Sequence, residues 1–358
     1  MLKSHFNLKH DEENAEEAAS ATHPEEYESI IESPKKSEIE LKPERKLHSA
    51  EICSRLSVLG RTAEGDGYAY LKVNCNGMNL TDVGALRSFK HLQYVDVSNN
   101  NLDLKSLQVL TELPYLLLIH ADKNNIHSAA LNKMKYLQVI IFNHNQIPSV
   151  HDVFQPELST LEVGYNKIQR INFENTMPTL KCLDFRYNFI NDISNLDFPN
   201  LDSLYLAGNK ITSLVGIERL HNLRILHVRN NPIKHLNGFE PELSKLQYVN
   251  LRNSKVATLK QVKKLRVLPA LETLILKGCP YLGGTGTESP ETAAEEEDPE
   301  LRIEVLAALP KLKRFNKGVV APEERKEANE LMKQWLEEGE MDIEEIDEET
   351  GEQESQND

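Results

Sequence analysis

The chain lacks long apolar runs and contains few cysteines. No stretch of about 18 consecutive apolar residues occurs among its 358 residues, so the sequence predicts no membrane span. Residues 1–14 are polar and acidic without an apolar stretch, and no secretory signal is expected. The four cysteines lie far apart and in no metal-ligand spacing, which favours a reducing compartment over a disulfide framework.

The net charge of −15 is distributed unevenly along the chain. Residues 1–69 carry a net charge of −6, residues 282–300 one of −7 and residues 319–358 one of −13. The remainder has 29 basic and 18 acidic residues, so a basic body carries three acidic segments. The composition predicts disorder in the acidic N-terminal segment, residues 1–48, and in the acidic tail, residues 341–358.

The basic body is an internal repeat of the form Leu-x-x-Leu-x-Leu-x-x-Asn-x-Leu. Ten copies begin at residues 70, 92, 116, 137, 158, 180, 201, 223, 246 and 271, at spacings of 21 to 25 residues. This period predicts an α/β leucine-rich-repeat solenoid over residues 70–318, with a C-terminal cap at its end. Parallel strands are expected on the concave face of the arc, and short helices or 3₁₀ turns on the convex face.

An asparagine follows the predicted strand in seven of the ten repeats. Its side-chain amide can satisfy backbone groups of the bend and of the adjacent coil, as a buried turn requires. The predicted structural asparagine ladder consists of Asn100, Asn124, Asn145, Asn166, Asn188, Asn209 and Asn231. Met78, Ser254 and Cys279 replace asparagine in the terminal repeats, and Cys279 is expected to be a ladder substitute rather than a reactive thiol.

Both ends of the solenoid need caps, because a terminal coil would expose its core side chains and its strand edge. At the N-terminal end, residues 49–69 are predicted to form a capping helix. Ile52, Leu56 and Leu59 would share one face of this helix, and Gly60 would end it.

At the C-terminal end, the predicted cap is interrupted by an acidic loop insertion at residues 282–300. Beyond the cap, a helix is predicted over residues 319–340 from apolar residues at spacings of three and four. Trp335, the single tryptophan, is expected to pack this helix against the cap rather than to leave it free for docking.

No motif for catalysis, a cofactor or a metal emerges from the sequence. The run Gly283-Gly-Thr-Gly286 lacks the Lys-Ser/Thr pair of a phosphate loop. His120 and His144 fall on different repeats, too far apart to share a metal, and Cys182 lies two strands from His227. The sequence therefore predicts a non-enzymatic protein without a small-molecule substrate or cofactor.

The concave face is the predicted binding surface. Residues that flank the inward leucine positions are expected to be exposed in the arc. Tyrosine and arginine at such positions are typical of protein interfaces. The predicted protein-binding residues are Tyr94, Tyr165, Arg186, Tyr187, Tyr205, His227, Arg229, Tyr248, Arg252 and Lys277.

Several stretches carry residues that the repeat consensus does not require. They are Leu80-Thr-Asp-Val83, Leu86-Arg-Ser88, His91-Leu-Gln-Tyr-Val-Asp-Val-Ser98, Leu204-Tyr-Leu-Ala207, Leu226-His-Val-Arg229 and Leu246-Gln-Tyr-Val-Asn-Leu-Arg252. In these residues the chain resembles the family of leucine-rich repeat-containing protein 23, from about Glu51 to about Glu338. The insertion at residues 282–300 departs from the family pattern.

The resemblance implies a structural subunit of the axonemal radial spoke, in the head of the third spoke, needed for motility of a cilium or flagellum. It implies protein subunits of the spoke as partners, neither substrate nor cofactor, and a place in the cytoskeleton of the axoneme within the cytoplasm. The alternative is a soluble leucine-rich-repeat adaptor in a nuclear ribonucleoprotein or in a phosphatase-regulatory complex. The basic body would attract RNA, but no aromatic stacking platform of a known RNA module is present and the acidic segments oppose phosphate, so nucleic acid is not an expected partner.

Overall fold

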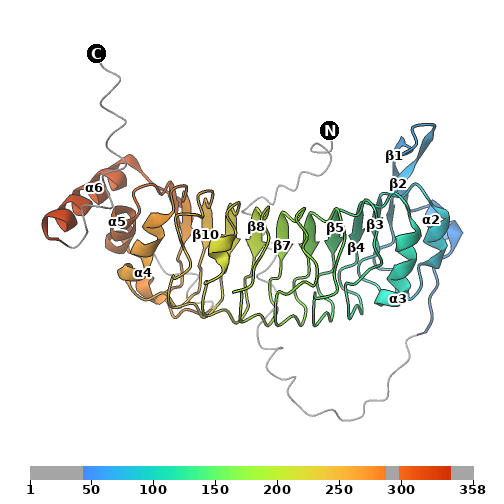
Figure 1. Cartoon of the computed structure of the whole chain (residues 1–358), viewed down its shortest axis with the longest axis horizontal. Coiled ribbons are helices and arrows are strands. Elements are labelled where there is room, and N and C mark those ends of the chain that lie inside the picture. Colours follow the sequence, from blue (N-terminus) through green and yellow to red (C-terminus); the bar gives the residue numbers. More distant parts are fainter. Residues whose placement is uncertain (1–42, 288–297, 340–358) are drawn as a thin grey trace, which may run out of the picture. The chain divides into compact units, whose positions relative to one another are not determined.

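The computed structural model describes residues 43–287 and 298–339 of the chain (Figure 1). All described helices and strands belong to one unit, which begins at Glu44. None of the helices in the described part of the chain combines the length and the apolar composition that crossing a membrane requires.

The acidic segments predicted to be disordered lie mostly outside the described residues. The last residues of the N-terminal segment, 43–48, are described and are ordered. Lys46 forms a β-bridge with Asp82, and the side chain of Leu47 is buried in the core. The ordered structure therefore reaches a few residues before the boundary predicted at residue 48, because Leu47 supplies apolar surface to the first coil.

Thirteen strands form one continuous sheet and follow one another in the order of the sequence (Figure 1). Strands β2 to β12 run parallel, and β1 and β13 add antiparallel edges. The bounds are β1 Leu56–Arg61, β2 Tyr68–Asn74, β3 Tyr94–Asp96, β4 Leu118–His120, β5 Val139–Ile141, β6 Thr160–Glu162, β7 Cys182–Asp184, β8 Ser203–Tyr205, β9 Ile225–His227, β10 Tyr248–Asn250, β11 Thr273–Ile275, β12 Arg314–Phe315 and β13 Gly318–Val319. The ten strands β2 to β11 coincide with the ten repeats, which confirms the leucine-rich-repeat arc.

The register of the sheet places the middle residue of every strand in one buried row. Leu183 pairs with Leu204, and Leu204 pairs with Leu226. All three side chains are fully buried in a core that runs without a break along the solenoid. Because side chains alternate across a strand, the residues on either side of this row lie on the open face of the sheet.

Short helices connect some coils, but the middle coils contain none among the described residues. The helices are α2 Ser49–Cys53, η3 Gly84–Ser88, α3 Leu104–Leu107, η4 Gln108–Glu112, η5 Ile217–Arg219, α4 Leu259–Lys263, η6 Lys264–Val267, η7 Pro280–Leu282, α5 Pro299–Ala308 and α6 Pro322–Glu337. Of these, η3, η4, η5, η6 and η7 are 3₁₀ helices. The connections after β5, β6 and β7 carry Pro148, Pro156, Pro178 and Pro199, and proline removes the amide donor that a helical turn uses.

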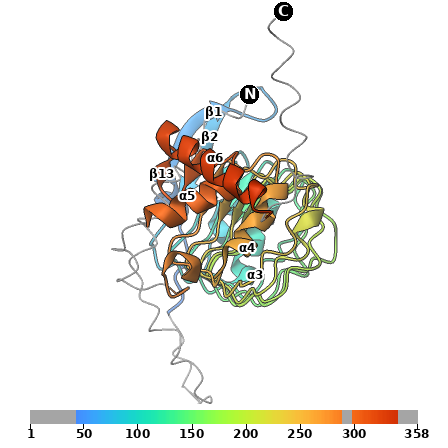
Figure 2. The ribbon, with the colours of Figure 1, turned by 90° about the vertical axis from the view of Figure 1, so that its left-hand side faces the viewer.

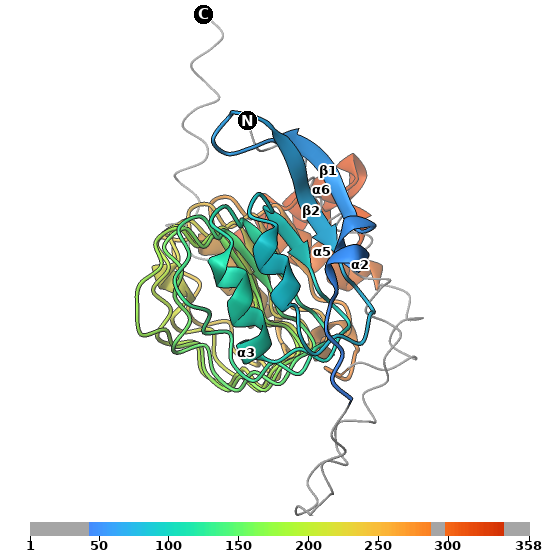
Figure 3. The same cartoon turned by 90° about the vertical axis from the view of Figure 1, so that its right-hand side faces the viewer.

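The N-terminal cap differs from the predicted helix over residues 49–69. Helix α2 ends at Cys53, and the chain then enters β1, which forms a hairpin with β2 (Figure 3). Leu56 pairs with Val73 and Leu59 pairs with Tyr70, so these leucines are strand residues and not a helix face. The helix prediction is wrong because pairing with a strand that already belongs to the first repeat outweighs the local spacing of apolar residues.

The C-terminal cap stacks α5 and α6 on the last coil (Figure 2). Arg302 of α5 pairs with Glu324 of α6 at 2.6 Å, and Arg325 donates to the carbonyl of Leu306 at 2.9 Å. Trp335 is only 8% exposed and belongs to the core cluster, with the ammonium of Lys263 at 4.5 Å from its ring centre. Helix α6 therefore packs against the cap. Most of the loop predicted at residues 282–300 lies outside the described residues.

Candidate functional site

The asparagine ladder holds successive coils together through the side-chain amides. The amide nitrogen of Asn188 donates to the carbonyls of Phe185 in its own coil at 3.1 Å and of Val163 in the preceding coil at 3.0 Å. Its amide oxygen accepts from the backbone nitrogen of Ile168 at 3.0 Å. The same bonds recur at Asn100, Asn124, Asn145, Asn166, Asn209 and Asn231. Each amide closes one buried turn and links two coils.

The ladder changes chemistry in the last coils. Cys279 donates from its Sγ to the carbonyl of Leu251 at 3.2 Å, the bond to the preceding coil that an asparagine makes elsewhere. Burial raises the pKa of the Cys279 thiol to about 12. The thiol is thus a structural donor, as the sequence indicates. At Ser254 the shorter side chain leaves its buried hydroxyl without a partner in the described part of the chain.

The residue before each ladder position adopts a left-handed backbone conformation. Glycine and asparagine tolerate this conformation, whereas bulky residues adopt it at a cost of about 1–3 kcal/mol each. The set is Gly77, Asn99, Lys123, His144, Tyr165, Tyr187, Gly208, Asn230, Asn253 and Gly278. Four consecutive turns are therefore occupied by residues that disfavour this conformation. These turns, called the rim below, are formed at Lys123, His144, Tyr165 and Tyr187, and the strained conformation makes the rim a candidate binding surface.

The side chains of three of these turns form a stack of rings. The ring centres of His144 and Tyr165 are 4.1 Å apart, and those of Tyr165 and Tyr187 are 4.6 Å apart, with nearly parallel planes. Equivalent positions on neighbouring coils lie about 4.8 Å apart, which is close to the stacking distance of aromatic rings. The repeat itself therefore arranges these rings face to face.

A second ring stack lies on the strands themselves. Tyr205, His227 and Tyr248 come from β8, β9 and β10, with ring centres 4.8 and 4.7 Å apart. The guanidinium of Arg186 lies 5.7 Å from the ring centre of Tyr205 and so connects this stack to the preceding coil. Tyr94, the remaining predicted tyrosine, lies five strands away in β3.

The N-terminal half of the open face is acidic around one histidine. His120 lies between two carboxylates, with Nδ1 3.5 Å from Asp96 and Nε2 3.2 Å from Asp122. Burial lowers the pKa of His120, but its bonds to Asp122 and Asp96 outweigh burial and raise that pKa to about 10. Burial also opposes ionisation of Asp96, yet His120 and Ser98 lower its pKa to about 2. This group is thus an internal ion triad.

The acidic half continues into β6 and β7. Asp184 is 3% exposed and holds Arg186, whose guanidinium nitrogens lie 2.6 and 2.9 Å from one carboxylate oxygen of Asp184. Glu162 accepts from the side-chain nitrogen of Asn143 at 3.2 Å. Burial, followed by the carboxylate of Asp184, raises the pKa of Glu162 to about 7. The prediction of binding residues left out these carboxylates, although they occupy the same strand positions as the predicted tyrosines.

The C-terminal half of the open face is basic. Arg229, Arg252 and Lys277 follow β9, β10 and β11 on consecutive coils, and residues 203–205, 225–227 and 248–250 contain no carboxylate. Contrary to the expectation of exposed side chains, Arg229 is only 8% exposed, and the other predicted binding residues are half-buried. Neighbouring coils are so close that each large side chain covers the next one.

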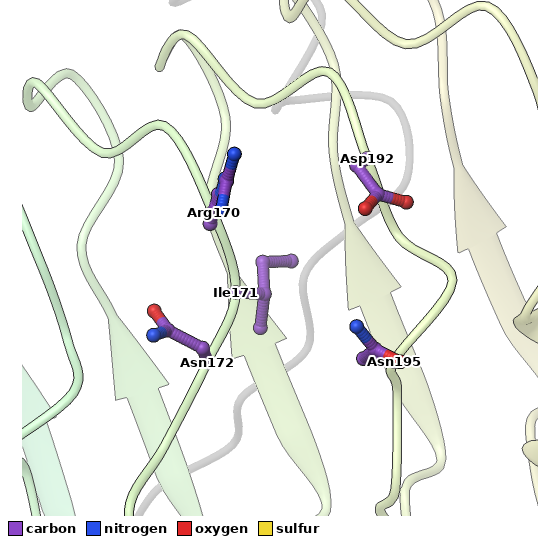
Figure 4. Close-up of a pocket in the computed structure, with 5 residues that line it drawn as sticks. All are labelled: Arg170, Ile171, Asn172, Asp192 and Asn195. Carbon is purple, nitrogen blue, oxygen red and sulfur yellow. The ribbon is translucent and has the colours of Figure 1, made fainter.

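Two further features of the described residues, a small cavity and a cysteine thiol, are candidates for a cofactor site or for catalysis. A cavity of about 210 Å³ lies between two coils and is lined by Arg170, Ile171, Asn172, Asp192 and Asn195 (Figure 4). Its volume is below the 300 Å³ or so from which ligand pockets usually start. On the inner sheet, burial raises the pKa of the Cys182 thiol, which disfavours the nucleophilic thiolate.

One group of side chains could in principle hold a cation, and the sequence analysis did not identify it. Ligand atoms of His151, Asp152 and Glu174 all lie within 4.8 Å of one another. All three residues are exposed, and such exposed groups are common without an ion. The cluster therefore does not by itself make a metal site.

Comparison with known proteins agrees with the repeat pattern. The family model "Leucine Rich repeats (2 copies)" matches residues 199–241. Leucine-rich repeat-containing protein 23 of Bos taurus is 35% identical over 278 residues, which are 77% of this chain and 77% of that protein. Its namesake in Mus musculus is 33% identical over 79% of both chains. The namesake in Xenopus tropicalis is 42% identical over 120 residues, which are 34% of this chain and 30% of that protein.

Among solved structures, an internalin (inlF) from Listeria monocytogenes matches with a TM-score of 0.49. The identity is 21%, and the match covers 66% of this chain and 64% of the internalin.

Proposed function

Because the chain belongs to the leucine-rich repeat-containing protein 23 family, we propose that it is a structural subunit of the motile-cilium or flagellum axoneme. In this proposal the chain is part of the radial spoke, in the head of the third spoke, and its partners are other spoke subunits. The coarser part of this function, a protein-interaction scaffold, follows from the family and from the repeats. The axonemal location and the spoke partners are the proposed part.

The open face of the sheet is the observation that supports an interaction role. The side chains of the open face are not needed to complete the core, because the buried row of strand residues already fills the space between coils. Even so, the rim carries His144, Tyr165 and Tyr187 in a backbone conformation that their residue types disfavour. Aromatic and arginine side chains contribute most to binding when a partner removes them from water. We infer that this face contacts the partner.

The proposal is tested by locating an epitope-tagged full chain in ciliated cells that lack their own copy. We expect the tagged chain to remain with the axonemes after detergent extraction. Arg229→Glu combined with Arg252→Glu should lower this retention, while the same change of charge at an exposed position, Arg219→Glu, should not. A tagged chain that is detergent-soluble or nuclear would contradict the axonemal proposal and favour a soluble adaptor.

A further inference from the structure

The basic half of the open face contains a buried cation without a counter-ion. Arg229 is 8% exposed, and within the described residues its guanidinium has no hydrogen bond and no carboxylate paired with it. Arg186, two coils earlier at the same repeat position, is held by Asp184 at 2.6 Å. Two arginines at equivalent positions therefore differ in whether the chain itself neutralises them.

Arg252, on the next coil, also has a donor without an acceptor. Its Nε atom is buried and has no hydrogen-bond partner in the described part of the chain. Withdrawing a cation or a polar N–H from water without a compensating bond costs free energy, so folded chains seldom leave such groups unpaired. An arginine without a counter-ion, next to an arginine whose buried Nε has no acceptor in the described part of the chain, thus indicates a site for an anion from outside the chain.

The surroundings restrict which anion fits. The stacked rings of Tyr205, His227 and Tyr248 come from β8, β9 and β10, and Arg229 and Arg252 follow β9 and β10, so the arginines lie beside a flat aromatic surface. Residues two apart in a strand-like segment share a face, so Arg229 lies on the same open face as the ring of His227. A chain that covers these rings can therefore carry an anion to both arginines.

Charge along the face favours a protein segment over a nucleic acid. The same face carries two carboxylates, Asp96 and Asp122, around the single His120 farther toward the N-terminus, and a phosphodiester backbone that follows the arc would be repelled there. A polypeptide can place carboxylates opposite the basic half and neutral or basic side chains opposite the acidic half. Extended polypeptides also present alternate side chains to one side, at about 6.6–6.8 Å intervals.

We propose that the basic half, formed by Arg229, Arg252 and Lys277 beside the rings of Tyr205, His227 and Tyr248, binds an extended glutamate- or aspartate-rich segment of a partner protein. One carboxylate of this segment pairs with Arg229 and Arg252, and the segment's backbone lies over the rings. The inference rests on the proposed scaffold function and specifies the chemistry of the partner. A charged hydrogen bond to buried arginines makes this contact specific as well as strong.

The test measures binding of a fluorescein-labelled 12-residue peptide of alternating glutamate and serine to the full chain by fluorescence anisotropy. A peptide of alternating glutamine and serine is the probe control. We expect the glutamate peptide to bind at 50 mM salt and more weakly at 300 mM, since screening weakens charge pairs. Arg229→Gln and Arg252→Gln should each weaken binding by about tenfold, and Arg219→Gln, on η5, should leave it unchanged.

A second readout separates binding from a structural role. Arg229→Gln removes a buried unpaired charge, so the melting temperature should be equal to or above that of the unmodified chain while peptide binding falls. The inference is overturned if the glutamate peptide does not bind, if the glutamine peptide binds equally well, or if the variants bind normally. It is also overturned if Arg229→Gln lowers the melting temperature, because the arginine would then serve the fold.

The result of the peptide-binding test is independent of the location experiment. Loss of axonemal retention by the unmodified chain, together with intact peptide binding, would contradict the proposed function and leave the acidic-segment site standing. Normal retention of the double variant together with lost peptide binding would separate the site from axonemal assembly. Each result therefore identifies which of the two proposals fails.

Discussion

The ring of Tyr187 lies directly against the backbone of Gly208 on the next coil. A Cβ atom at position 208 would be 2.5 Å from Cδ1 of Tyr187, well inside the distance that real contacts allow. Gly208 also has a positive φ of 68°. Glycine at this turn therefore serves two purposes, because it accepts the left-handed backbone and leaves room for the last ring of the rim stack.

Gly208→Ala should destabilise the chain by about 1–3 kcal/mol, since the added methyl group meets the Tyr187 ring in a backbone conformation that alanine disfavours. The measurement is the free energy of unfolding in denaturant. Gly67→Ala is the matched control, because nothing lies within 4 Å of a Cβ atom there. Equal effects of the two changes would contradict the contact.

Leu204→Asp should cost several kcal/mol, because it places a carboxylate in the row of side chains that neighbouring coils share. The expected observation is a large drop in the melting temperature followed by circular dichroism. Lys234→Asp, at an exposed position, should change stability by no more than about 0.5 kcal/mol. An unchanged melt of Leu204→Asp would show that the repeat register is wrong.

Asn188→Leu should cost roughly 1–3 kcal/mol by leaving the carbonyls of Val163 and Phe185 and the amide of Ile168 without partners. Asn172→Leu, at an exposed position, should have little effect on unfolding in denaturant. If Asn188→Leu instead abolished partner binding at unchanged stability, the residue would have a functional rather than a structural role.

Glu162 should make the stability of the chain depend on pH. Its folded-state pKa is raised from 4.5 to about 7 by burial and by Asp184, so the folded chain holds this proton more tightly than the unfolded chain. Its contribution to stability is therefore fully present below pH 4.5 and is lost as the pH rises through 7. Glu162→Gln, uncharged throughout, should match the unmodified chain near pH 4 and exceed its stability near pH 8 by on the order of 1–3 kcal/mol.

The measurement for Glu162 is denaturant unfolding of both chains at a series of pH values between 4 and 8. Glu157→Gln, at an exposed position on the preceding connection, is the control and should show no such divergence. A stability difference that stays constant across this range, or that shrinks as the pH rises, would contradict the raised pKa.

The sequence by itself determined the repeat architecture. A period of 21 to 25 residues allows one strand per coil, and a pair of alternate apolar residues has only one face that can enter the shared core. Position, face and register of β2 to β11 therefore follow from local pattern. The same alignment brought Tyr165 next to Tyr187 and Tyr205 next to His227, because equivalent positions of adjacent repeats stack.

Only the tertiary structure decided the N-terminal hairpin and the state of the charged side chains. The spacing of Ile52, Leu56 and Leu59 fits a helix, and the non-local pairing of Leu56 with Val73 made a strand instead. Likewise, Arg186 and Arg229 occupy equivalent positions in the repeat, yet one has Asp184 two residues before it and the other has His227. Local sequence fixes which positions face the arc, whereas burial and pairing depend on what the neighbouring coils place beside them, because the free energy of a charge is set by its surroundings.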